Sequence, residues 1–336
     1  MKKFSIILPV RNGGEYVKEC VNSILNQSYL DFELIVLDNC STDGTKEWVE
    51  SLNDKRITIL TAERPMNIEE SWARVTTIKK NEFITIIGHD DILYANFLET
   101  IDKLISKNPS ASLYLTHFDL IDAGGKLLRQ CKPMQPRYTG DELLKAILTN
   151  SIDLMGTGYV MRAKDYDEME GIPVKYPSLL YADFELWVNL ASLSFEAVAP
   201  DNCFAFRIHP STAHSSQDSK LHTAMNILID YLSALKSKDE KMDEVINEYG
   251  NEFLLFYCKG FSHRLLRTNI KQREGMTVKK MIGQTKVWSK KIGLEEQYHP
   301  EKSASIKIAK IIDNNMILRR IFLLFKRVYP KSIIKK

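Results

Sequence analysis

The sequence predicts an α/β protein, in which helices flank a mostly parallel central sheet and a helical region follows at the C-terminus. Over the first 120 residues, short apolar runs alternate with segments of helical periodicity. The apolar runs are continuous, which is typical of parallel strands covered by helices on both faces. From about Ser219 onward the periodicity is helical throughout.

The first part of the chain contains five expected strands and four expected helices. The strands are Phe4–Val10, Glu33–Asp38, Ile57–Leu60, Phe83–Ile87 and Ser112–Leu115. The helices between them are Glu15–Gln27, Thr45–Leu52, about Ile68–Lys80, and Ala95–Lys107.

Residues 121–215 are less regular. They contain an expected helix at Asp141–Leu148, a strand at Gly158–Arg162 and a helix at about Ala182–Leu193. We therefore expect an α/β domain over residues 1–215, with halves 1–120 and 121–215. A helical region should cover residues 216–336, with breaks near Gly275 and Pro300.

Composition excludes several classes of protein. The chain is 44% hydrophobic and 26% charged, which is ordinary for a soluble globular protein. Its five cysteines are scattered and form no C-x-x-C pair, which argues against a disulfide framework or a zinc knuckle and favours a reducing compartment. The apolar run FSIILPV is too short for a signal peptide, and no run is long enough to span a membrane. We expect a cytoplasmic protein and no nucleic-acid partner.

Polar clusters follow three of the expected strands. They are Arg11 to Gly14 after the first strand, Asp38 to Gly44 after the second, and Gly88 to Asp91 after the fourth. Turn formation explains any one of these clusters. The carboxyl ends of parallel strands share one edge of a sheet, however, and ligands bind at that edge. Three polar clusters at that edge of the sheet therefore favour a ligand-binding site.

The type of site is narrowed by what the sequence lacks. There is no G-x-G-x-x-G after the first strand and no G-x-x-x-x-G-K-[ST], so neither a dinucleotide fold nor a P-loop is supported. Asp90 and Asp91 are adjacent at a strand end, where their charges repel. A divalent cation held by carboxylate oxygens would offset that repulsion, and Mg²⁺ and Mn²⁺ prefer such ligands.

Three motifs, "FSIILPVRN", "ELIVLDNCSTDGT" and "NEFITIIGHDDIL", resemble in order and spacing the family 2 glycosyltransferases with the A-type (GT-A-like) nucleotide-sugar fold. The resemblance covers about residues 1–215 and implies a nucleotide-binding half at 1–120 and an acceptor half at 121–215. It implies that Pro9, Asn12 and Asp38 line the nucleotide pocket. Asp43 is a further candidate, although it also fits a turn leading into a helix.

The same resemblance implies a Mn²⁺ or Mg²⁺ cofactor. Aligned on "DDIL", the family's D-x-D motif has Gly88 in its first position and Asp90 in its last, so one carboxylate is missing. Asp90 would bind the metal and Asp91 would orient it. His89 would supply a compensating contact, or would simply be an exposed histidine at a strand end.

Three further candidates come from the resemblance. Arg74 falls where the family often has a basic residue that reaches the diphosphate, but it also fits a solvated helix position. In "FRIHPST" His209 would complete the metal site, unless it is an ordinary surface histidine, and Arg207 would reach phosphate or support the site.

In "YADFELW" Ala182 replaces the first acid of the family's acceptor-side pair, and Asp183 would be the catalytic base. Its alternative is a role in starting the helix.

The C-terminal tail is strongly basic. Residues 302–336 contain ten Lys or Arg and one Asp, a net charge of +9 in a chain whose total is +3. On a helical wheel, residues 317–328 separate an apolar arc from a basic one. We expect residues 316–336 to contact the inner face of an anionic membrane. Packing on the body of the protein, or on a second subunit in a homodimer, is the alternative.

The expected function is inverting, metal-dependent transfer of a single sugar from a nucleotide-diphosphate sugar to a hydroxyl acceptor. The resemblance implies a UDP-sugar as the donor and a glycan or lipid-linked acceptor in surface polysaccharide or glycoconjugate synthesis. Single transfer is expected because the chain lacks the membrane helices and the Q-x-x-R-W stretch of processive members. The departures at Gly88 and Ala182 leave open a degenerate transferase that only binds a nucleotide or a partner. A sugar-phosphate nucleotidyltransferase is disfavoured, because Arg11 to Gly14 matches its glycine- and arginine-rich loop poorly.

Overall fold

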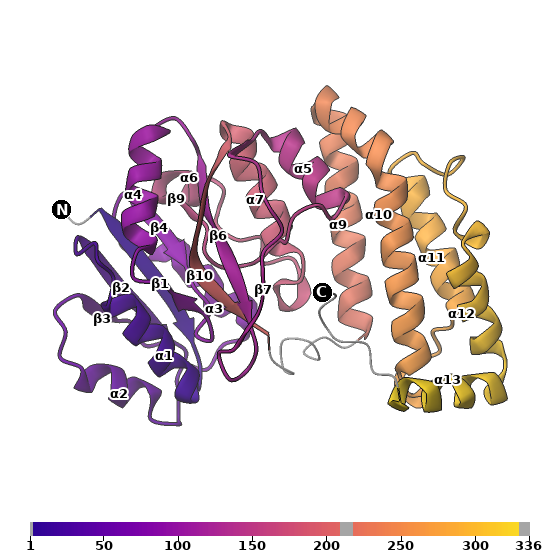
Figure 1. Ribbon diagram of the computed structural model, residues 1–336, viewed down its shortest axis with the longest axis horizontal. Helices are drawn as coiled ribbons and strands as arrows, with labels where there is room; N and C mark the ends of the chain where they lie inside the picture. The colour runs from indigo at the N-terminus through magenta and orange to yellow at the C-terminus, as the bar shows by residue number, and fades with distance from the viewer. Residues whose placement is uncertain (1–2, 209–217, 329–336) are drawn as a thin grey trace. The chain divides into compact units, whose positions relative to one another are not determined.

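The computed structural model describes residues 3–208 and 218–328 (Figure 1). The chain forms two compact units, the first from residues 1–143 and 152–224 and the second from residues 144–151 and 225–336. The division falls between Ala224 and Met225, inside α9 (Asp218–Lys238); the domain boundary predicted at 215 lies outside the described residues. A continuous helix there explains why no change in composition marks the division.

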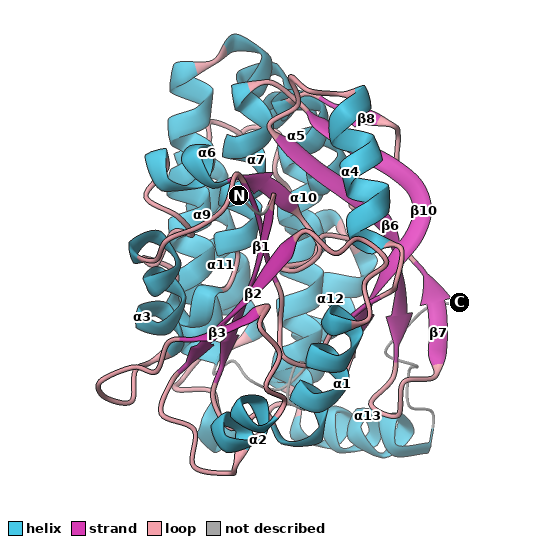
Figure 2. Cartoon of the chain, turned by 90° about the vertical axis from the view of Figure 1, so that its left-hand side faces the viewer, coloured by secondary structure: helices cyan, strands magenta, loops and turns pink. Residues whose placement is uncertain are grey.

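The first unit is built on a mixed sheet with the strand order β3-β2-β1-β4-β9-β6-β10-β5, to which β7 and β8 add at β6 and β10. Figure 2 shows β1, β2 and β3 side by side in this sheet. The first strands are β1 (Phe4–Val10), β2 (Phe32–Asp38), β3 (Ile57–Ile59), β4 (Phe83–Ile86) and β5 (Ile92–Leu93). The later ones are β6 (Leu113–Ile121), β7 (Leu127–Gln130), β8 (Arg137–Tyr138), β9 (Val160–Arg162) and β10 (Glu196–Arg207).

The expected parallel sheet is found at β3-β2-β1-β4, where every pairing is parallel. Beyond β4 the sheet is mixed rather than mostly parallel, because β9 lies antiparallel between β4 and β6. Only the first four strands alternate regularly with helices, and this alternation is what predicts parallel pairing. The GT-A-like arrangement with a helical C-terminal region is otherwise as predicted.

The helices of the first unit largely follow the predicted periodicity. They are α1 (Gly14–Leu25), α2 (Thr45–Ser51), α3 (Ile68–Ala73), α4 (Phe97–Lys107), α5 (Gly140–Leu148, which continues into the second unit), α6 (Ala163–Glu168) and α7 (Ala182–Leu193). The predicted helix at 68–80 is shorter, because a 3₁₀ turn at Arg74–Thr77 (η1) replaces its second half. A second 3₁₀ turn, η2, covers Pro177–Leu179.

Burial explains why the strand ends are held firmly. All seven residues of β1 are buried, and α1 covers the sheet with Val17, Cys20, Val21 and Ile24. Such a core fixes the strands and leaves their carboxyl ends as a rigid platform.

The second unit is helical in the part that is described. Besides most of α9 it contains α10 (Glu240–Arg267), α11 (Val278–Lys291), α12 (Ala304–Asn314) and α13 (Met316–Val328), with 3₁₀ turns η3 (Ile270–Gln272) and η4 (Pro300–Lys302) at the predicted breaks. Trp288 of α11 is buried and donates from Nε1 to Asn226 Oδ1 of α9 at 2.6 Å. Across residues 3–208 and 218–328, no helix has the length and apolarity needed to cross a membrane.

Candidate active site

The ends of β1 and β2 are joined by hydrogen bonds through Asn12. Its Oδ1 accepts from the Thr42 N–H at 2.8 Å, and its own N–H donates to Ser41 Oγ at 3.0 Å. Asn12 has a φ of 54°, a left-handed conformation that Asn tolerates better than most residues. The first two predicted clusters therefore form one continuous rim.

Asp43 is occupied in shaping that rim. Its carboxylate accepts the N–H groups of Gly14 and Thr45, each at 3.0 Å. Burial alone would raise the pKa of Asp43, but hydrogen bonds from the Thr45 hydroxyl and these two backbone groups lower it below its ordinary value. These contacts favour the turn that the sequence left as the alternative for Asp43.

Asp38 ends β2 and is only 1% exposed. Its carboxylate accepts the Ser41 N–H, with the two oxygens at 3.2 and 3.4 Å. Arg74 lies beside it and donates from Nη1 to the Asp38 carbonyl at 3.1 Å and from Nη2 to the Leu60 carbonyl. Arg74 is therefore held at the end of β2 rather than being a fully solvated helix residue. Pro9 lies one residue before the end of β1, buried and in register with Leu37.

The third cluster packs two carboxylates around Gly88. A Cβ atom built on Gly88 would lie 2.8 Å from Asp90 Oδ1 and 3.0 Å from Asp91 Oδ2. Both oxygens therefore approach the same side of Gly88, and an acid at this position would require them to move. Glycine in place of the first acid leaves room for the two carboxylates in this arrangement.

Asp91 is 3% exposed and accepts the Arg207 N–H on Oδ1 at 3.0 Å. Burial, followed by the charge of neighbouring Asp90, raises the pKa of Asp91 well above its usual range. Like charges crowded at a buried strand end suit a divalent cation, so the oxygen donors here fit the metal that the resemblance implies.

Arg207, the last residue of β10, holds the Asp90–Asp91 turn in place. It is 1% exposed, and its guanidinium donates from Nε to the Asp90 carbonyl at 2.7 Å, from Nη1 to the Ala123 carbonyl at 3.2 Å, and from Nη2 to Glu19. The guanidinium carbon also lies 4.6 Å from the centre of the Tyr16 ring. These contacts favour an orienting role for Arg207 over the contact with phosphate.

The structure describes only one of the two histidine candidates for the metal site. His89 lies half-buried between Gly88 and Asp90 at the end of β4. His209 lies outside the described residues. Within residues 3–208 and 218–328, no group of three or more His, Cys, Asp or Glu side chains is arranged to hold a metal ion. The pairing of Asp90 with His209 stays a prediction.

Asp183 lies in the first turn of α7, directly after Tyr181 and Ala182. Its Oδ1 accepts the Phe184 N–H at 2.9 Å, and its Oδ2 lies 3.9 Å from where a Cβ on Gly156 would be. The side chain keeps some solvent access, yet burial raises its pKa to about 6. Ala182 is completely buried, so the acid that the sequence motif led us to expect would have no place in the core.

A loop that sequence analysis did not single out, residues 153–158, covers this carboxylate. Trp187 of α7 donates from Nε1 to the Met155 carbonyl at 3.0 Å and stacks on Tyr159 at a centroid distance of 4.2 Å. Gly158 has a φ of 82°, and a Cβ on it would lie 2.3 Å from the Phe204 ring. The G-x-G spacing before an expected strand is the signal that could have identified this loop.

Sequence comparison decides the family. Residues 5–169 match the sequence pattern of glycosyl transferase family 2. Over these residues the chain belongs to that family. The resemblance inferred from the three strand-end motifs is thus confirmed, and residues 5–169 form a glycosyltransferase domain.

Two family 2 relatives illustrate the range of similarity. Glycosyltransferase GlyG of Streptococcus pneumoniae serotype 4 is 28% identical over 36% of this chain, and the match spans 41% of GlyG. The Escherichia coli protein WfgD, a UDP-Glc:alpha-D-GlcNAc-diphosphoundecaprenol beta-1,3-glucosyltransferase, is 26% identical over 68% of this chain and 86% of its own length.

Solved structures share the fold. S. aureus TarS 1-349 in complex with UDP-GlcNAc superposes with a TM-score of 0.67 at 18% identity, covering 99% of this chain and 95% of that one. The mannosyltransferase PcManGT from Pyrobaculum calidifontis, in complex with GDP-Man and Mn²⁺, has a TM-score of 0.54 at 11% identity, covering 98% and 88%. At these identities the likeness establishes the GT-A-like fold of this family 2 chain and no more.

Proposed function

We propose that this family 2 glycosyltransferase moves a single sugar from a nucleotide-diphosphate sugar, in the first instance a UDP-sugar, to a hydroxyl acceptor with inversion at the anomeric carbon. The observation that carries the proposal is Asp183. Its pKa of about 6 leaves it ionised at neutral pH but still basic enough to accept a proton.

The donor would lie along the rim formed by the ends of β1, β2 and β4. Asp38 would meet the nucleoside where β2 ends, and Arg74, which is held at the Asp38 carbonyl, would reach the diphosphate. Pro9, Asn12 and Asp43 would shape this pocket, since Asn12 and Asp43 already hold its two loops together. UDP is favoured because the TarS complex and the name of WfgD both specify it.

The metal would be held by Asp90, together with His209, while Asp91 orients the turn and His89 lies alongside. Oxygen donors crowded around Gly88 suit Mn²⁺ or Mg²⁺, and the ion would neutralise charge on the departing diphosphate. Arg207 would keep Asp90 and Asp91 in place through the contacts described above.

The chemical step would be a single displacement. Asp183 accepts the proton of the acceptor hydroxyl as the oxygen forms its bond to the anomeric carbon. The bond from that carbon to the diphosphate oxygen breaks, and the nucleoside diphosphate leaves with the electron pair. Attack opposite the leaving group inverts the configuration.

The acceptor would bind against α7 and the loop at 153–158, which surround Asp183. A hydroxyl of a glycan or lipid-linked saccharide is the proposed class, because WfgD is named for such an acceptor and the Bacillus subtilis relative TuaG is named for teichuronic acid biosynthesis. A cytoplasmic location belongs to this proposal and is supported by the five unpaired cysteines.

Thermal shift followed by donor hydrolysis tests the proposal. The chain is melted with UDP, GDP and CDP, each with and without Mn²⁺, and UDP-sugar hydrolysis is then compared among the wild type, Asp183→Asn and Asp165→Asn. Asp165 is a matched control, because it lies in the first turn of α6 and burial also raises its pKa.

We expect UDP with Mn²⁺ to raise the melting temperature and only Asp183→Asn to lose hydrolysis. Stabilisation with no turnover on any donor would favour the degenerate, nucleotide-binding alternative. If no nucleotide changes the melting temperature, the proposal fails.

A further inference from the structure

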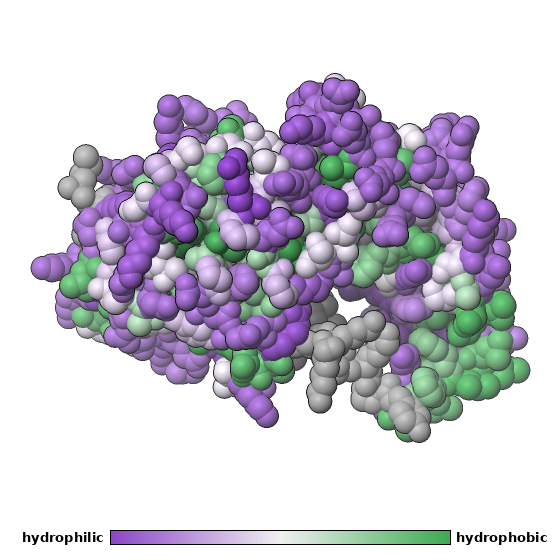
Figure 3. All heavy atoms as spheres, turned by 45° about the horizontal axis from the view of Figure 1, so that its top comes forward, coloured by the Kyte–Doolittle hydropathy of each residue, from purple (hydrophilic) through white to green (hydrophobic). Residues whose placement is uncertain are grey.

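The last described helix, α13, shows its apolar side to solvent. None of its residues is buried, although its sequence is amphipathic. The exposed apolar surface, which we call the apolar arc, continues onto α12 and consists of Ile308, Ile311, Ile317, Ile321, Leu324, Phe325 and Val328. It appears as the green area at the lower right of Figure 3. Contiguous apolar surface of this kind marks an interaction site.

The opposite side of α13 packs on the rest of its unit through a cation. Arg319 donates to the carbonyls of Leu266 and Thr268 at the C-terminal end of α10. A positive side chain is favourable there, because unpaired carbonyls give a helix end a partial negative charge. Asn315 caps the start of α13 by accepting the N–H groups of Ile317 and Leu318. The helix is thus fixed with its apolar arc facing outward.

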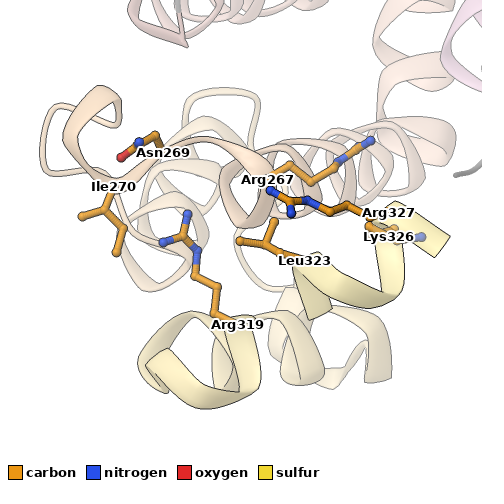
Figure 4. Close-up of a pocket in the computed structure, with 7 residues that line it drawn as sticks. All are labelled: Arg267, Asn269, Ile270, Arg319, Leu323, Lys326 and Arg327. Carbon is orange, nitrogen blue, oxygen red and sulfur yellow. The ribbon is translucent and has the colours of Figure 1, made fainter. Parts of the chain in front are cut away.

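A cationic pocket of about 510 Å³ lies beside this packing contact (Figure 4). Arg267 of α10 and Arg319, Lys326 and Arg327 of α13 line it, together with Asn269, Ile270 and Leu323. Arg319 donates to two carbonyls at the end of α10, and Arg267 donates from Nε to the His263 carbonyl in its last turn at 3.3 Å. No carboxylate lines the pocket within the described residues, so it attracts an anion.

We propose that α13 and the adjoining face of α12 dock on an anionic phospholipid bilayer through the apolar arc, and that the cations of the pocket, which lies on the other side of α13, add electrostatic attraction to the anionic surface. Apolar side chains with an aromatic member enter the boundary of the acyl chains, while flanking lysines and arginines meet the phosphates.

Charge distinguishes a bilayer from a second copy of the chain as the occupant. Arg320 and Arg327 lie along one edge of the apolar arc, so two arcs meeting in a dimer would bring like charges of both copies to the contact, which is unfavourable. An anionic bilayer supplies the opposite charge along the same edge. Beyond the described residues the sequence adds Lys331, Lys335 and Lys336, and its net charge favours the same partner.

Vesicle sedimentation with the full chain tests the proposal without any donor or acceptor, so its outcome is independent of transferase activity. The vesicles are phosphatidylcholine alone, or phosphatidylcholine with one part in three of phosphatidylglycerol, at low salt. The pocket variant is Arg267→Gln/Lys326→Gln/Arg327→Gln, and the arc variant is Ile321→Ser/Phe325→Ser. Arg319 is left intact because it holds α13 in place.

The matched control removes three exposed lysines from other helices of the same unit, Lys241→Gln/Lys279→Gln/Lys290→Gln, and changes the net charge equally. Circular dichroism and melting temperature establish that each variant is folded. Inorganic phosphate is added to a further sample as a competitor, to separate binding of a free anion from binding of a membrane.

We expect the wild type to sediment with phosphatidylglycerol vesicles and not with phosphatidylcholine alone. The pocket variant should bind roughly a hundredfold more weakly, because each basic residue at an anionic surface contributes about a factor of five. The arc variant should lose binding at equal charge, and the control should retain it.

Four results would overturn the proposal. The first is no sedimentation of the wild type with anionic vesicles. The second is an equal loss in the control, which would reduce the effect to net charge. The third is a concentration-dependent dimer that the arc variant abolishes while vesicle binding is absent, which would assign the apolar arc to a second copy. The fourth is full competition by millimolar phosphate, which would assign the pocket to a free anion.

Discussion

Replacing Asp183 by Asn should abolish transfer and yet stabilise the protein. Burial raises the pKa of this carboxyl from an ordinary 3.8 to about 6, so the folded state disfavours the ionised form. Asparagine removes the ionisation while its amide oxygen can still accept the Phe184 N–H, now bonded to Oδ1 at 2.9 Å. A group kept for catalysis at a cost in stability behaves in this way.

The magnitude follows from the size of the shift. About two pKa units correspond to roughly 3 kcal/mol of unfolding free energy, since each unit is worth about 1.4 kcal/mol. Two effects reduce that figure. Asp183 keeps some solvent access, and a carboxylate in the first turn of α7 gains roughly 0.3–1 kcal/mol from the helix dipole. We therefore expect Asp183→Asn to stabilise the protein by about 2 kcal/mol at pH 8.

The sign of the pH dependence is opposite to that of a salt-bridged carboxylate. The unfolded chain releases the proton near pH 4 and the folded state only near pH 6. The unfolding free energy of the wild type therefore falls as the pH rises from 4 to 6. Below pH 4 both states are protonated and the advantage of the variant should vanish. Wild-type kcat/KM should fall as pH drops below about 6, because the base takes up its proton.

Melting temperatures of the wild type, Asp183→Asn and Asp165→Asn at pH 4, 6 and 8 measure the effect. Asp165→Asn should change stability less, since the charges of Arg162 and Lys164 oppose the burial of that carboxyl, and should leave hydrolysis intact. If Asp183→Asn lowers the melting temperature at pH 8, the carboxylate stabilises the fold and the argument for a base of raised pKa is wrong.

Three further substitutions test the geometry of the site. Gly88→Asp should weaken Mn²⁺-dependent stabilisation by UDP rather than improve it, because Asp90 and Asp91 already occupy the space of its Cβ; a Mn²⁺ titration followed by melting temperature decides this. Arg207→Lys keeps the charge but not the three-way guanidinium contacts, and should cost roughly 2–4 kcal/mol of stability and raise the Mn²⁺ requirement of hydrolysis. Gly158→Ala should lower the unfolding free energy, measured in urea, by more than about 2 kcal/mol, because its φ is left-handed and its new methyl group would meet the Phe204 ring. Gly260→Ala is the control: this position in α10 is open, and the change should raise the unfolding free energy by about 0.5–1 kcal/mol.

The rim of the first four strands could be predicted because its signals are local. A continuous apolar run predicts a buried strand, and parallel strands place their carboxyl ends together, so the sequence alone predicts that Asn12, Asp38 and Asp90 share one edge. No such rule covers β10. Its Pro200, Asp201 and Asn202 are typical of a turn, but they form an irregularity inside one long strand paired with β6.

Because β10 was not predicted, the contacts of Arg207 with the Asp90–Asp91 turn could not be predicted either. Arg207 contacts the Asp90–Asp91 turn across 116 and 117 positions of sequence, and only the pairing of β10 brings them together. Sequence patterns report the periodicity within an element, whereas the register between distant strands depends on packing. The phosphate contact expected for Arg207 was a local inference, and the guanidinium is instead enclosed by Glu19, Tyr16 and two carbonyls.

The packing around Gly88 and Ala182 gives a structural reason for both small residues. In the sequence both are losses of an acid, and together they were the argument for a degenerate, non-catalytic protein. In the fold, Gly88 makes room for two carboxylates, and Ala182 is wholly buried beneath the first turn of α7. A site that had decayed would be free to accept bulk or charge at such positions, since nothing would depend on the carboxylates nearby. Here Gly88 leaves room for Asp90 and Asp91, and Ala182 occupies a buried position beside Asp183, so packing accounts for both departures without loss of the site.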